Sequence, residues 1–243
     1  MVFIKGEKIY RKLVNAVIKL RKSNKKVIFL SNNSTLSRQE YVKKMEKLGI
    51  KVSIDEVFNS GCITAQILKK NNWIRAYVIG KQGLLDELAS AGVKVVNKGD
   101  VDCVVVGLDR KFNHGKLSKA MLYVKNCAKF VATNLDSTLP LAKFEIPGAG
   151  ALVAALEFCT GVKPYLVIGK PSPVALDFIT RKYRLLKDEI VMVGDRPDTN
   201  VQAAYNAGID SMLVLTSVAR KEDLLSNYPK PTFVLEDLLE MFM

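Results

Sequence analysis

Short apolar segments alternate along the chain with longer segments in which hydrophobic residues recur every three or four positions. Apolar runs rich in β-branched residues predict strands, and they occupy 27–30, 76–80, 103–108, 129–133, 165–169, 190–194 and 211–215. The helical period predicts helices near 9–22, 36–48, 61–71, 83–91, 116–127, 148–160, 173–183, 199–207 and 234–242. This alternation predicts an α/β protein with a largely parallel sheet.

The strands VIFL and IVMVG are apolar at every position, as strands covered by helices on both faces of a sheet require. In open parallel sheets, ligands bind beyond the carboxyl ends of the strands. Candidate site residues are therefore those directly after each apolar run.

The first polar strand end is SNNST, residues 31–35, between the strand at 27–30 and the helix predicted from 36. A helix N-terminus offers unpaired N–H groups and a positive dipole end. Together with hydroxyl and amide side chains it makes a phosphate cradle. A plain helix cap is the alternative, but five polar residues exceed what one cap needs.

Two later strand ends carry charges. Lys170 lies between Gly169 and Pro171, where the restricted backbone can present one compact cation to a phosphoryl group. Asp195 follows Gly194, and such a carboxylate suits a hard cation such as Mg²⁺. A solvated lysine and a simple turn are the alternatives. Taken together, the three strand ends indicate phosphoryl-transfer chemistry.

Composition narrows the classes of partner. The formal net charge of +13 would suit nucleic acid, an anionic substrate or a lysine-rich surface. The lysines are scattered and no RRM, KH or zinc-finger pattern occurs, so we expect no nucleic-acid partner. We expect no membrane span or secretory signal, and four widely spaced cysteines favour reduced thiols in a cytoplasmic protein.

Two other chemistries are disfavoured. The single histidine, His114, stands in the polar stretch RKFNHGK, where a solvated side chain is expected. GAGAL, residues 148–152, lacks the third glycine of a dinucleotide-binding loop and an acidic residue on the next strand.

The segments FLSNNST, IGKPSP and VMVGDRPDTN, with VVVGLDRKF, ATNLDSTLP and IPGAGALVAALE between them, resemble the haloacid dehalogenase superfamily. The similarity is to its 4-nitrophenylphosphatase, phosphoglycolate phosphatase and NagD-like branch, and it covers essentially the whole chain. It implies a Rossmann-like core over 1–72 and 164–243. It also implies an inserted α/β cap of the C2 type over 73–163, which closes over the site.

The resemblance assigns roles to individual residues. Ser31 and Asn32 would contact phosphate, with Asn33 in support, and Lys170 would neutralise the phosphoryl group. Asp195 would ligate Mg²⁺, the expected cofactor. The surroundings of the metal would include Asp198 and Asn200, where the family often has a second acidic residue. Residues of the cap that would select the substrate are Asn134, Asp136, Pro147, Gly148 and Gly150.

The family's nucleophile is the first Asp of a strand that ends in DxDG, and it forms an aspartyl-phosphate. Here VFIKG, residues 2–6, resembles the stretch that follows DxDG, so Met1 falls about where its glycine belongs. We expect a start assigned at an internal methionine, because the other motifs are intact; an inactive relative is the alternative. The missing strand would be central, so a longer chain is expected to be more stable.

The function expected from the resemblance is Mg²⁺-dependent hydrolysis of a small phosphorylated metabolite, with a homodimer formed through the caps. The alternative is a protein that binds a phosphorylated ligand without turnover. Activity that requires Lys170 would exclude this alternative.

Overall fold

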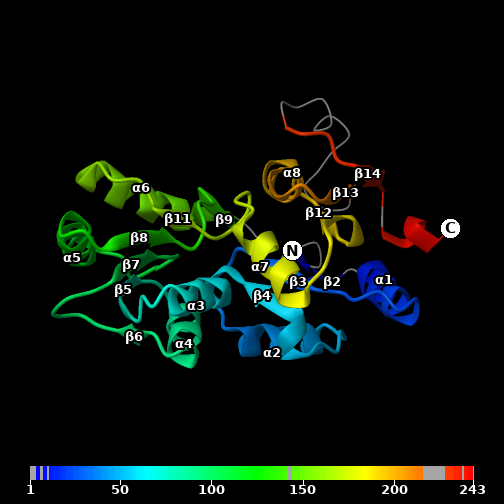
Figure 1. Ribbon diagram of the computed structural model, residues 1–243. Coiled ribbons are helices and arrows are strands. Elements are labelled where there is room, and N and C mark those ends of the chain that lie inside the picture. The colour runs from blue at the N-terminus through cyan, green and yellow to red at the C-terminus, as the bar shows by residue number, and fades with distance from the viewer. Residues whose placement is uncertain are drawn as a thin grey trace. The chain divides into compact units, whose positions relative to one another are not determined.

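The computed structural model describes residues 4–5, 8–9, 11–141, 144–215, 228–236 and 238–242. The chain forms two compact units (Figure 1). One contains both termini and comprises residues 1–29, 46–51 and 170–243; we call it the terminal unit. The other comprises residues 30–45 and 52–169 and is called the central unit.

The central unit is built on a parallel sheet with strand order β11-β8-β7-β5-β6. Its strands are β5 (Arg75–Ile79), β6 (Lys94–Val95), β7 (Cys103–Val106), β8 (Lys129–Ala132) and β11 (Leu166–Val167). A two-stranded sheet joins β3 (Phe29–Ser31) and β4 (Val57–Asn59). The strands β9 (Thr138–Pro140) and β10 (Glu145–Pro147) pair antiparallel.

The helices α5 (His114–Lys125) and α6 (Ala149–Thr160) pack on this parallel sheet. The other helices of the central unit are α2 (Arg38–Lys47), α3 (Ser60–Lys70) and α4 (Gln82–Ser90), with the 3₁₀ turn η1 (Ile54–Glu56) before β4. On one face, Val104, Val106 and Phe130 of the sheet pack with Val124 of α5 and Leu156 of α6 in a buried cluster. On this face, the apolar strands β7 and β8 are covered by helices.

The terminal unit has a parallel sheet of β12 (Val191–Gly194), β13 (Asp210–Val214) and β14 (Phe233–Leu235). Ala16, Met212, Val214 and Leu238 form a buried cluster beside it. The remaining elements are the hairpin of β1 (Ile4–Lys5) and β2 (Lys8–Ile9), α1 (Arg11–Lys22), α7 (Val174–Tyr183), the 3₁₀ turn η2 (Lys187–Glu189), the π-helical turn η3 (Pro197–Val201), α8 (Gln202–Ala207) and the 3₁₀ turn η5 (Leu238–Phe242).

The predicted α/β fold with parallel sheets is confirmed, and each of the seven predicted strands overlaps an observed one. The helix predicted at 234–242 is wrong, because Phe233–Leu235 instead pairs with β13 and only the 3₁₀ turn Leu238–Phe242 follows. The first part of the helix predicted at 199–207 is the π-helical turn. The proposed division into core and cap stays a prediction. No helix in the described part of the chain is long and apolar enough to cross a membrane.

Candidate functional site

Residues 31–35, which we call the phosphate loop, fold through their own side chains at the end of β3. The Ser31 hydroxyl accepts a hydrogen bond from the backbone N–H of Asn33 at 3.2 Å. The Asn33 side-chain oxygen accepts one from the N–H of Thr35 at 2.8 Å, which is an Asx turn. The polar run therefore does more than cap the following helix: it sets the path of the loop.

Tyr41, one turn into α2, holds the phosphate loop through its hydroxyl. Its hydroxyl lies 3.0 Å from the Ser31 hydroxyl and donates to the Asn33 carbonyl at 3.4 Å. Burial raises the pKa of Tyr41 to about 12, against a smaller lowering by the hydrogen bond with Ser31. The phenol is therefore a neutral hydrogen-bonding group over the physiological range.

Asn32 is anchored by residues 28 and about one hundred positions later. Its carbonyl accepts hydrogen bonds from Asn134 Nδ2 at 2.9 Å and from the Ser60 hydroxyl. Its own Nδ2 donates to the two carboxylate oxygens of Asp136 at 3.1 and 3.2 Å. The Asp136 N–H donates to Asn134 Oδ1 at 3.1 Å, which fixes this segment in turn. The orientation of the Asn32 amide is thus set by a carboxylate.

Gly169, two residues after β11, has no room for a side chain, because Asn32 and Asn134 lie against it. A Cβ atom there would lie 2.7 Å from the Asn134 Cβ, 2.8 Å from the Thr133 carbonyl oxygen and 2.9 Å from Asn32 Oδ1. Real Cβ atoms do not approach other atoms so closely. The glycine that precedes Lys170 therefore allows three segments of the central unit to meet.

The predicted substrate-selecting residues all lie in the central unit. Gly148 is the N-cap of α6, and Gly150 lies in its first turn. The N–H groups of Gly148 and Gly150 donate to the carbonyls of Ser137 and Asp136 at 2.8 and 2.9 Å. Pro147 ends β10 and pairs with Thr138. Two of the glycines thus pack the start of α6 on the segment that carries Asp136.

In the terminal unit, Asn200 connects the predicted cation and the predicted carboxylate. Lys170 Nζ donates to Asn200 Oδ1 at 2.5 Å, and Asn200 Nδ2 lies 3.4 Å from Asp195 Oδ1. All three side chains are buried. Gly194 leaves the space for this arrangement, since a Cβ there would overlap the Asn200 side chain. The neutral amide thereby aligns a buried ammonium group and a buried carboxylate.

Asp198 faces Arg196. The guanidinium binds the Asp198 carboxylate through Nε at 3.0 Å and through its terminal nitrogen at 2.5 Å. Over the described residues, no three His, Cys, Asp or Glu side chains gather in a way that could hold a metal ion. The buried carboxylate of Asp195 can thus supply one of the six or so oxygen ligands of Mg²⁺.

Two positioning contacts were not foreseen from the sequence. Tyr41 lies inside the helix predicted at 36–48 and Ser60 directly before the helix predicted at 61–71, and neither was assigned a contact. A hydroxyl on an otherwise apolar helix face is the signal that could have drawn attention to Tyr41, because buried tyrosine hydroxyls usually have partners.

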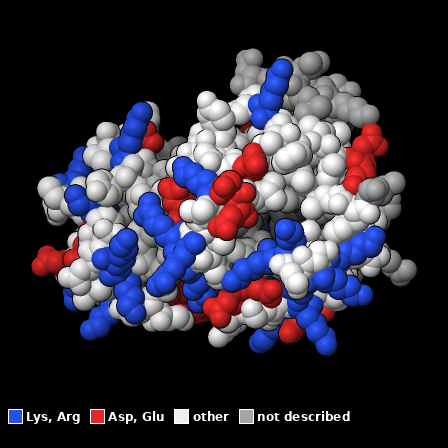
Figure 2. Space-filling view, turned by 45° about the vertical axis from the view of Figure 1, so that its right-hand side comes forward, with Lys and Arg blue, Asp and Glu red and all other residues white. Residues whose placement is uncertain are grey.

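Basic side chains are spread over the face shown in Figure 2, with acidic ones between them. This distribution gives no dominant basic block on that face, in keeping with the scattered lysines of the sequence.

The chain is similar to known phosphatases. A family model described as haloacid dehalogenase-like hydrolase matches residues 2–94, and a HAD-hydrolase-like model matches residues 167–241. The chain is 37% identical over 212 residues to an acid sugar phosphatase of Staphylococcus epidermidis, covering 87% of this chain and 82% of the relative. It is 36% identical over 243 residues to chloroplastic phosphoglycolate phosphatase 1A of Arabidopsis thaliana, covering 89% and 67%.

A solved structure shows the same likeness in three dimensions. The p-nitrophenyl phosphatase from Archaeoglobus fulgidus superposes with a TM-score of 0.93 at 32% identity, over 99% of this chain and 95% of that one.

Proposed function

The chain belongs to the haloacid dehalogenase-like hydrolases, as one of their phosphatases, and from this premise we propose that it hydrolyses small phosphomonoesters in a Mg²⁺-dependent reaction. The observation that carries the proposal is the buried Lys170–Asn200–Asp195 arrangement, in which Lys170 Nζ lies 2.5 Å from Asn200 Oδ1. Burying an ammonium group and a carboxylate costs desolvation free energy, which protein partners or a bound charged ligand must offset. Similarity to acid sugar, phosphoglycolate and p-nitrophenyl phosphatases supports small substrates.

The phosphate loop would bind the non-reacting phosphoryl oxygens. The Ser31 hydroxyl would turn its proton from Tyr41 to a phosphoryl oxygen, and Asn32 would donate the side-chain N–H that Asp136 does not accept. The turn at Asn33 holds the loop in place. The contact of Asn32 with Asp136 would let the segment that selects the substrate also orient a phosphate ligand. Lys170 would neutralise charge on the phosphoryl group, which is the main requirement of phosphoryl transfer.

Asp195 would be one ligand of the metal ion. It fits because it is a buried carboxylate at a strand end, with Asn200 Nδ2 lying 3.4 Å from its Oδ1. When bound, Mg²⁺ would supply positive charge that stabilises the transferring phosphoryl group. Asp198, bonded to Arg196, would act only through water in the metal's surroundings.

The proposal also concerns the residue that attacks the phosphoryl group. The printed sequence contains no DxDG, and we propose that a strand carrying it pairs with β12. In the described residues β12 has one strand neighbour, β13, and Val191 at its start is exposed. An edge of this kind favours a further strand. The intact mass of the protein from its natural source tests this. A mass about 1 kDa or more above 27.0 kDa would fit one further strand, whereas a mass of 27.0 kDa would contradict it.

The activity test uses 4-nitrophenyl phosphate, phosphoglycolate and sugar phosphates with and without Mg²⁺. In the form of the protein that carries the DxDG strand, Lys170→Ala should lower kcat by about two to three orders of magnitude, as does the loss of one preorganised charge-stabilising donor. The matched control is Lys182→Ala, on α7 in the same unit, which should keep wild-type turnover. Phosphate binding without turnover in every natural form of the protein would instead favour a phosphate-ligand binder. A cytoplasmic location and a homodimer through the cap stay predictions.

A further inference from the structure

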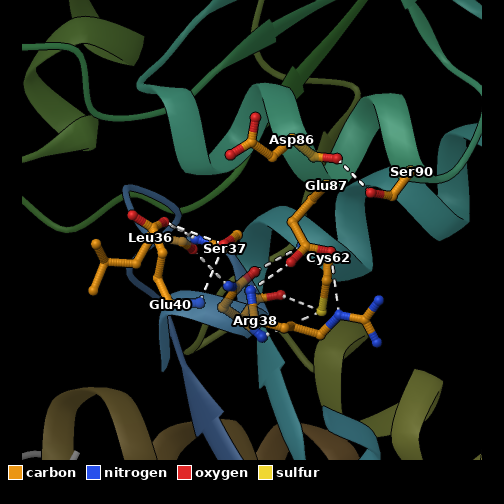
Figure 3. A network of polar contacts seen from close by, with 9 residues as sticks. Leu36, Ser37, Arg38, Glu40, Cys62, Asp86, Glu87 and Ser90 are labelled. Carbon is orange, nitrogen blue, oxygen red and sulfur yellow. Dashed lines mark hydrogen bonds and ion pairs between the residues drawn. The ribbon is translucent and has the colours of Figure 1, made fainter. Parts of the chain in front are cut away.

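Glu87 is a buried acidic residue for which the proposed reaction has no use. It lies on α4, in the segment between β5 and β6, and its side chain points to the start of α2 (Figure 3). One carboxylate oxygen accepts a hydrogen bond from the backbone N–H of Arg38 at 2.5 Å, and the other accepts one from Arg38 Nε at 3.1 Å. A buried carboxylate without such partners would be strongly unfavourable.

The position of these bonds is specific. Arg38 is the first residue of α2, so its N–H is one of the donors that the helix itself leaves unpaired. Ser37 and Glu40 already form a reciprocal cap, with the Ser37 N–H donating to Glu40 at 2.7 Å and the Glu40 N–H to the Ser37 hydroxyl at 3.3 Å. Glu87 adds a negative charge at the positive end of the helix dipole. Together with the Ser37–Glu40 cap, it fixes where α2 begins.

The first turn of α4 also touches the residues just before α2. At Gly83, a Cβ atom would lie 2.5 Å from the Leu36 Cα and from the Ser37 backbone nitrogen. Asn59 Nδ2 also donates to the Leu36 carbonyl at 2.8 Å. Residues 36–38 are thus held both by α4 and by the N-cap of α3.

From α2 the constraint passes to the phosphate loop. Tyr41, three residues after Arg38, bonds the Ser31 hydroxyl and the Asn33 carbonyl. Glu87 is therefore connected to the loop through its hydrogen bonds with Arg38, the first turn of α2 and the buried hydroxyl of Tyr41. Every member lies in the central unit.

We propose that Glu87 is a positioning residue for phosphate binding: by anchoring the start of α2, it sets the place of Tyr41 and hence of the Ser31 hydroxyl in the phosphate loop. This inference rests on the proposed function, which assigns phosphate binding to the loop. Glu87 touches no part of the loop itself, so it acts only through α2.

The test measures binding of inorganic phosphate to the full chain by titration calorimetry in the presence of Mg²⁺. Glu87→Gln keeps the shape but removes the charge, and should weaken phosphate binding about tenfold, since charge-assisted hydrogen bonds are about twice as strong as neutral ones. The matched control is Asp86→Asn, whose carboxylate points away from residues 36–38 (Figure 3) and is exposed to solvent. It should bind phosphate as the wild type does.

A second variant separates positioning from simple loss of stability. Arg38→Met removes the Nε donor but keeps the backbone bond, and should weaken phosphate binding about threefold. In the Glu87→Gln background its effect should be smaller, because contacting residues are energetically coupled. Thermal melts of each variant show whether the fold persists, and Arg38→Met decides the matter if Glu87→Gln does not fold.

The outcomes are distinct. Unchanged phosphate affinity in a folded Glu87→Gln or, failing that, in Arg38→Met overturns the inference while leaving the phosphate site in place. A wild-type chain that binds no phosphate overturns the proposed function, and the inference falls with it. Equal weakening by Asp86→Asn would show a general charge effect and would also overturn the inference.

Discussion

The side-chain amide of Asn32 donates to both carboxylate oxygens of Asp136, at 3.1 and 3.2 Å, across 104 residues of sequence. A carboxylate accepts hydrogen bonds only, so it selects one orientation of the amide: nitrogen toward Asp136 and oxygen away from it. The proposed phosphate-binding amide is therefore oriented by a residue that the sequence suggested only for substrate choice.

Asp136→Ala should reduce kcat/KM for phosphomonoesters about 10- to 100-fold, because a hydrogen bond to a charged group contributes about 1.5–3 kcal/mol. Asp136→Asn, which retains an acceptor, should lose less. Steady-state kinetics of the two variants will measure this. Glu145→Gln, in the neighbouring strand β10, serves as the control, and equal losses in Asp136→Ala and this control would contradict the prediction.

Gly169→Ala should destabilise the protein by about 1–3 kcal/mol, the usual cost of forcing an extra methyl group into a packed site. The added Cβ would meet Asn134, the Thr133 carbonyl and Asn32. Urea denaturation measures the change. The control is Gly115→Ala, on α5. Its new Cβ would lie 3.4 Å from Asn113 Oδ1, an ordinary contact distance, so this substitution should be tolerated. Equal stability of both variants would rule out the close approach at Gly169.

Asn200→Asp should tighten Mg²⁺ binding about tenfold, because the charge of the ligand set tunes the affinity for hard cations. The new carboxylate would stand beside Asp195, and Lys170 would balance its charge. Titration calorimetry with Mg²⁺ gives the affinity. Gln202→Glu adds the same charge at the start of α8 and should leave the affinity as it is; a matching gain there would point to a non-local charge effect.

The free energy of unfolding should fall as pH rises from about 9 to about 12. Burial raises the pKa of the Cys62 thiol from 9.0 to about 12, so in this interval the unfolded chain releases a proton that the folded chain keeps. The folded state then binds more protons, and this thiol lowers the stability by up to about 1.4 kcal/mol per pH unit. Cys103 and Tyr41 add to the slope, because burial also raises the pKa of each to about 12.

Urea denaturation across this pH interval will show the slope. Cys62→Ala should make it shallower, whereas Cys127→Ala, at an exposed position, should leave it unchanged. A slope that is the same in all three proteins would refute the assignment to Cys62.

The apolar runs made the parallel sheets predictable, because strands such as Val191–Gly194 carry their signal at every position. Strands of two or three residues, such as Val57–Asn59, hold too few positions for a period to be seen. The phosphate loop, Lys170 and Asp195 were proposed as site residues from their places at strand ends. The roles proposed for Tyr41 and Glu87 depend on contacts between distant segments, and no local pattern encodes those contacts.

The bond between Asn134 and the Asn32 carbonyl bears on directed evolution of this protein. A library that randomises residues 134–136 to obtain a new substrate range would remove the supports of the phosphate loop in most of its members. From the role we propose for this loop, we expect most clones of such a screen to be inactive on every substrate. Leu135, whose side chain is 46% exposed, is the position in this segment that can be recoded while Asn134 and Asp136 keep their hydrogen bonds.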